Sequence, residues 1–72
     1  MDYELLIQNA EGERRVHSRR RGDMPSKGDL VEVNVNGAAL EMKVMAVKDV
    51  YRETGSVWRV TLDETTAEAA PR

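Results

Sequence analysis

The sequence has no cysteine, no phenylalanine and a single histidine among its 72 residues. Without thiols there is neither a disulfide framework nor a thiolate metal site, and one histidine cannot form a transition-metal cluster. We therefore expect no metal and no cofactor. The first 13 residues have no basic segment followed by a long apolar run, and the longest apolar stretch anywhere is Val44 to Val47. These absences predict a cytoplasmic protein that makes no contact with a membrane.

Catalytic machinery is also missing from the sequence. A nucleophile needs a base within hydrogen-bond reach, but His17 lies among arginines, and no motif surrounds Ser18 or Ser26. The acidic pairs, Glu11 with Glu13 and Asp63 with Glu64, stand beside turns or strand ends, where carboxylates are usually solvated. The sequence therefore predicts that the protein is not an enzyme.

The length allows one small domain, which buries only about 60% of the surface that its unfolded chain exposes. We place this domain at residues 1–64. The last eight residues, TTAEAAPR, contain no large apolar side chain. They predict a disordered C-terminal tail at residues 65–72.

Alternation of apolar and polar residues predicts several strands. Tyr3, Leu5 and Ile7 would face a core, and a turn near Gly12 would lead into a second strand with Ile7 opposite Val16 and Leu5 opposite Ser18. The alternative register, which sets Arg15 against Ile7, would bury a charge. In this strand pair Glu4 would lie across from Arg19.

The clearest strand holds Val31, Val33 and Val35, and Asn36-Gly37 follows it directly. This dipeptide favours a two-residue hairpin turn. Further along, Trp58, Val60 and Leu62 share one face of another strand, so Trp58 is better interpreted as core than as a binding platform.

Residues 38–53 are ambiguous. Alanine, leucine, glutamate, methionine and lysine favour a helix, and Leu40, Val44, Val47 and Tyr51 recur at helical spacing. We prefer one long bent strand, because three valines are β-branched and because a change of alternation near Met45 and Ala46 suits a bulge. The alternative is an α+β fold with a helix at about 38–53.

The segments Pro25-Ser26-Lys27-Gly28-Asp29-Leu30-Val31, Lys43 to Val47 and Val60-Thr61-Leu62 resemble the P-x-x-G-D-x-V layout of small SH3-like barrel proteins of bacteria and phages. The resemblance covers about half of the chain and implies an all-β fold: a small antiparallel SH3-like barrel of about five strands. It implies little about function, because such barrels bind peptides or nucleic acids or form assembly contacts.

Basic residues concentrate in one stretch. Residues 14–27 carry a net charge of +5, so the rest of the chain carries −7 to give the overall −2. The candidate binding residues are Arg14, Arg15, His17, Arg19, Arg20, Arg21 and Tyr51. Arg15, His17 and Arg19 would project from one outer face as a basic strip, which is either a grip for phosphates or a solvated face of weak ion pairs.

Two functions remain. The first is a non-enzymatic interaction or assembly module that binds a protein partner or itself, with Leu6, Leu30 and Met45 as outer apolar residues. The second is nucleic-acid binding through the arginine strip.

Overall fold

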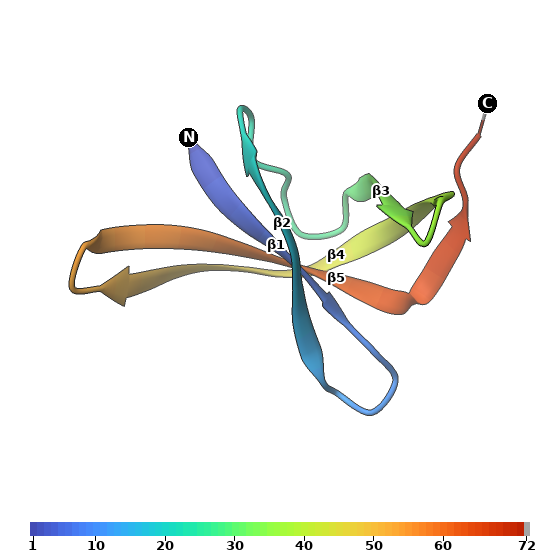
Figure 1. Cartoon of the computed structure of the whole chain (residues 1–72), viewed down its shortest axis with the longest axis horizontal. Helices are drawn as coiled ribbons and strands as arrows, with labels where there is room; N and C mark the ends of the chain where they lie inside the picture. The colour runs from blue at the N-terminus through green and yellow to red at the C-terminus, as the bar shows by residue number, and fades with distance from the viewer. Residues whose placement is uncertain (72) are drawn as a thin grey trace.

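The computed structural model describes residues 1–71, and in this range the chain forms five strands and no helix. They are β1 (Asp2–Gln8), β2 (Arg14–Arg21), β3 (Leu30–Val35), β4 (Ala38–Arg52) and β5 (Gly55–Ala69) (Figure 1). The predicted all-β fold is confirmed. The alternative helix at 38–53 is wrong, because that segment is the long strand β4. Residues 1–71 thus offer no helix that could cross a membrane.

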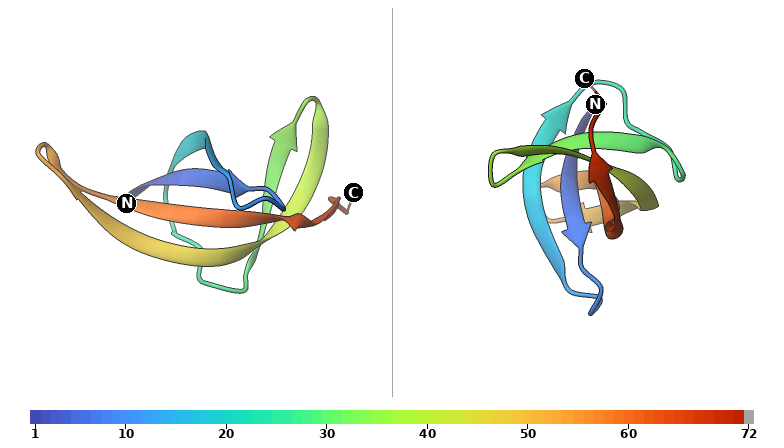
Figure 2. Two further views of the ribbon diagram at one scale, coloured as in Figure 1. Left: turned by 90° about the horizontal axis from the view of Figure 1, so that it is seen from below. Right: turned by 90° about the vertical axis from the view of Figure 1, so that its right-hand side faces the viewer.

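The strands form one sheet in the order β2-β1-β5-β4-β3. Three of the four pairings are antiparallel, whereas β1 and β5 run parallel, with Leu5 beside Val60 and Ile7 beside Leu62. The order of the strands in the sheet therefore differs from their order along the chain. β5 instead lies between β1 and β4, so the strands that supply most of the core occupy the middle of the sheet and β2 and β3 become its edges. The sheet curls into a half-barrel, consistent with a small SH3-like barrel (Figure 2).

The core lies on the concave side of this sheet. Leu5, Val60 and Leu62 are fully buried there, and strands β3 and β4 add Val33 and Met42. Trp58 is half-buried and packs against this cluster, as the sequence predicts. Alternating residues of every strand except β2 thus supply a core that contains no phenylalanine.

Local turn chemistry sets the hairpins. Asn36 and Gly37 have φ angles of 52° and 85°, which is the geometry of the predicted two-residue turn between β3 and β4. In the loop that precedes β3, Asp29 accepts a hydrogen bond from the Ser26 amide, and the Gly28 amide donates to the Val44 carbonyl. This loop therefore fastens the start of β3 to the middle of β4.

Strand β4 bends where a bulge was predicted. The register with β5 shifts between Val44 and Ala46, which leaves Met45 as the extra residue. Beyond the point where Trp58 pairs with Tyr3, strands β4 and β5 continue as a two-stranded arm, seen at the left of Figure 1. The arm is the part of the molecule that projects farthest from the half-barrel.

The predicted disordered tail is wrong for residues 65–69. Strand β5 continues to Ala69, which pairs with Leu40, while the Thr66 hydroxyl accepts a hydrogen bond from the Lys43 amide. The pairing of Glu68 and Ala69 with β4, the hydrogen bond at Thr66 and the partly buried Ala67 hold this stretch, although it has no large apolar side chain. Arg72, the last residue of the predicted tail, lies outside the described residues.

Candidate functional site

A bulge in β2 decides where the arginines lie. Leu5 pairs with Ser18 and Glu4 with Arg19, as predicted, but the register then shifts so that Leu6 pairs with Val16. The extra residue is His17. The predicted pairing of Ile7 with Val16 is therefore wrong.

Ile7 instead lies opposite Arg15, the pairing that was rejected because it would bury a charge. The charge is not buried, because Ile7 is only half-buried and Arg15 is exposed. A bulge also places two successive side chains on the same side of a strand, which breaks the alternation expected for β2.

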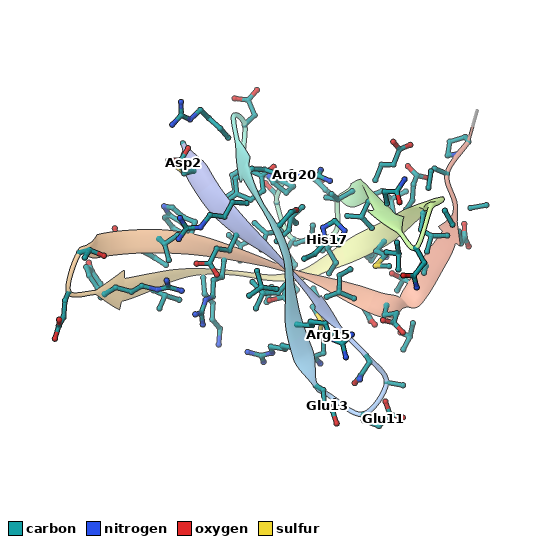
Figure 3. All side chains as sticks on the ribbon, viewed as in Figure 1. Asp2, Glu11, Glu13, Arg15, His17 and Arg20 are labelled. Carbon is teal, nitrogen blue, oxygen red and sulfur yellow. The ribbon has the colours of Figure 1, made fainter. Side chains whose placement is uncertain are left out.

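The predicted basic strip is consequently divided between two places, and Arg15, His17 and Arg19 do not share one face. Figure 3 shows Arg15, His17 and Arg20 on the β3 side of β2. Arg19 instead pairs with Glu4, which lies on the face opposite the core residues Tyr3 and Leu5.

The first place is the seam, which we define as the junction between the edge strands β2 and β3. His17 Nε2 lies 2.9 Å from the Asn34 carbonyl oxygen, and Arg20 Nη2 donates a 2.9 Å hydrogen bond to the Glu32 carbonyl. His17 Nδ1 is also 2.9 Å from the Ser18 hydroxyl. Side chains thus link the two edges where a closed barrel would have a backbone ladder.

A groove of about 430 Å³ opens at one end of the seam. Ile7, Val16 and Val35 contribute apolar surface, and Glu13, Arg15 and Glu64 contribute charge of both signs. Arg14 also borders the groove, but its Nε donates to the Gln8 side chain at 2.8 Å. The mixed charge gives this groove no clear preference for an anion.

The second place is the basic cluster, which we define as Arg19, Arg52 and Arg59 around the Glu4 carboxylate. Glu4 is only 4% exposed. Arg52 donates to Glu4 Oε1 at 2.8 Å, whereas Arg19 Nη2 lies 3.6 Å and Arg59 Nε 3.8 Å from the carboxylate. One buried carboxylate therefore faces three guanidinium groups from three other strands.

Arg21 lies next to this cluster but is paired with another acid. Its Nε donates a 2.9 Å hydrogen bond to Asp2, and this bond holds the pKa of the Asp2 carboxyl below its ordinary value while raising that of Arg21. A polar recess of about 220 Å³ lies beside this pair, bordered by Arg19, Arg52 and the residues 54–57 of the arm.

The remaining candidates are apolar. Tyr51 is 84% exposed on the arm, and Leu30 is 60% exposed on the edge strand β3. Met45 is half-buried at its bulge. Leu6, expected at the surface, is 6% exposed, because it lies between Val16 and Thr61 in the interior of the sheet.

Sequence reasoning missed Arg52 and Arg59 as partners of Glu4. They stand 48 and 55 positions away along the chain, and only the parallel pairing of β1 with β5 brings Arg59 beside Glu4. A weak signal existed: Arg59 is the charged residue between the core residues Trp58 and Val60, so its side chain had to leave on the outer face. Within residues 1–71, no three acidic or histidine side chains come together as a metal site requires.

Comparisons with known proteins add no family to this description. No protein-family model matches the sequence, and no curated protein and no solved structure matches it significantly.

Proposed function

We propose that the protein is a non-enzymatic interaction and assembly module that associates with a second copy of itself through the open edge of its half-barrel. The observation that carries the proposal is the pair of sheet edges: within residues 1–71, β2 and β3 each pair through their backbone with one strand only, and side chains alone join them along the seam. Edge strands present unpaired backbone groups, which readily pair with another chain unless they are protected.

The two edges differ in their protection. β2 carries five arginines, and charged side chains are a common means of blocking edge pairing. β3 contains no lysine, arginine or proline and one exposed charge, Glu32, and the side chains that guard it, His17 and Arg20, come from β2. Its first residue, Leu30, is an exposed apolar side chain. These features favour β3 as the surface that associates.

A small domain also gains stability from association, because its own core is small. Two copies that meet through the same edge around a two-fold axis form a closed dimer. The contact would bury Leu30 of both copies.

Sedimentation equilibrium over a concentration series tests the proposal. We expect a mass above that of the monomer at high micromolar concentration and a shift towards the monomer for Leu30→Lys. Tyr51→Lys is the matched control, because it adds the same charge at an exposed apolar position on the arm. A monomer at every concentration would refute self-association, and an equal effect of both substitutions would refute the assignment to β3.

A further inference from the structure

The basic cluster contains more positive charge than its carboxylate needs. Only Arg52 is within hydrogen-bond distance of Glu4, and Arg19 and Arg59 lie 3.6 and 3.8 Å away. An isolated buried carboxylate is costly, so one close guanidinium has a structural role. Two more guanidiniums leave a surplus that points to an anion from outside the chain.

The surplus extends along the outer face of the sheet. Arg19, Glu4 and Arg59 lie in register on β2, β1 and β5, and Lys48 of β4 pairs with Arg59 in the same row. Together with Arg52, this row has four cations and one carboxylate, a net charge of +3. Asp49, the acid next to Lys48, pairs with Trp58 and so belongs to the opposite face of the arm.

One further observation indicates where an anion would bind. The recess of about 220 Å³ is bordered by Arg19 and Arg52, by Thr54 and Ser56, and by Asp2, whose carboxylate is already paired with Arg21. Arg59 does not border this recess: among the described residues, its buried Nε has no hydrogen-bond partner and lies 3.8 Å from the Glu4 carboxylate. Arg59 therefore adds to the positive charge of the row, whereas the recess itself is the place where an anion would contact Arg19 and Arg52.

We propose that this outer face binds the phosphate backbone of a single-stranded nucleic acid, with one phosphate in the recess between Arg19 and Arg52. Guanidinium groups bind phosphate oxygens through paired hydrogen bonds, and hydroxyl groups donate to the same oxygens. A flexible strand can place single phosphates in a recess, which a rigid duplex cannot do as easily. No aromatic side chain belongs to the row of cations, so binding is independent of base sequence.

Fluorescence anisotropy with a labelled oligothymidine tests the proposal. Three phosphate contacts predict a log-log salt slope of about −2 for a single strand, so the affinity falls roughly 20-fold between about 50 and about 200 mM salt. Absence of binding at tens of micromolar protein in low salt would overturn the proposal. Tighter binding of a labelled polyglutamate peptide would also overturn it, because the ligand would then be an acidic protein.

Substitutions locate the site. Arg19→Gln should weaken binding several-fold and reduce the salt slope by about 0.7 without unfolding the domain, because Arg19 is largely exposed and does not hydrogen-bond to Glu4. Arg15→Gln removes the same charge from an exposed position of the same strand, at the seam, and should have little effect.

Glu4→Gln gives the sharpest result. It keeps an acceptor for Arg52 and raises the net charge of the row to +4, so the affinity for the oligonucleotide should increase. Circular dichroism of each variant confirms that it is folded. Equal losses for Arg19→Gln and Arg15→Gln, or no gain for a folded Glu4→Gln, would refute this location of the site.

Discussion

Val33→Asp tests the assignment of faces in the clearest strand. Val33 is 2% exposed and lies in the core cluster of the concave side. The substitution removes a valine burial worth about 1.5–3 kcal/mol. It also leaves an unpaired buried carboxylate, which typically costs about 3–5 kcal/mol. Together these exceed the roughly 3–5 kcal/mol that a core of this size supplies, so the variant should be unfolded at room temperature.

Asn34→Asp is the matched control on the neighbouring residue. Asn34 is exposed, and its side-chain oxygen accepts a hydrogen bond from the Gly37 amide across the hairpin turn. Aspartate keeps that acceptor, so the stability should change by less than about 0.5 kcal/mol. Far-ultraviolet circular dichroism and urea titration measure both variants. A cooperative transition of Val33→Asp near that of the parent protein would refute the reasoning, because the residue could not then be buried.

Two further predictions concern side-chain contacts at the surface. Replacing both His17 and Arg20 by alanine removes the side chains that link β2 to the β3 carbonyls. The free energy of unfolding measured by urea titration should then fall by about 1–3 kcal/mol. Self-association measured by sedimentation should increase if β3 is the associating edge. The second concerns pH: because the hydrogen bond from Arg21 lowers the pKa of Asp2 from 3.8, the pair stabilises the fold above about pH 4, and this contribution is lost as the pH falls through the lower folded pKa. Thermal melts at about pH 2 and about pH 5 test this: the melting temperature of Asp2→Asn should differ less between the two pH values than that of the parent protein. An equal difference in both proteins would contradict the prediction.

The features that the sequence predicted correctly are those with a local cause. Asn36-Gly37 tolerates positive φ, and the alternating valines before it require one buried face, so the hairpin and its core residues follow from neighbouring positions. The bulge at Met45 follows from a change of phase within one strand. Each of these depends on fewer than about ten residues of chain.

The features that could not be predicted depend on partners far away in the sequence. Nothing in Tyr3 to Ile7 indicates that β5 runs parallel beside them. Strand β5 extends to Ala69 because Glu68 and Ala69 pair with β4 and the Lys43 amide donates to Thr66, contacts that are independent of side-chain hydrophobicity. The bulge at His17 has no marker comparable to an Asn-Gly dipeptide.

In the candidate site, too, the local run of arginines was visible in the sequence, whereas the faces on which they lie were not. Sequence proximity suggested one strip of arginines, but a single extra residue in β2 sends Arg15 and His17 towards the seam, where alternation already places Arg20, and leaves Arg19 on the outer face. A run of charged residues in a strand therefore does not show which face of the sheet each side chain lies on, because that depends on the register.

Glu4 connects the register of the sheet to the chemistry of its outer face. Side chains alternate along a strand, so a slip of one residue between β1 and β5 would carry the Glu4 carboxylate to the core side and an apolar neighbour to the basic cluster. The correct register instead places it beside Arg59 and opposite Arg19, with Arg52 donating from the arm. No hairpin turn sets the register of β1 against β5. The cost of burying the Glu4 charge in the core therefore disfavours the shifted register. The same arrangement gathers guanidinium groups from β2, β4 and β5 around one carboxylate, so the residue that fixes the register also creates the surplus of positive charge on that face.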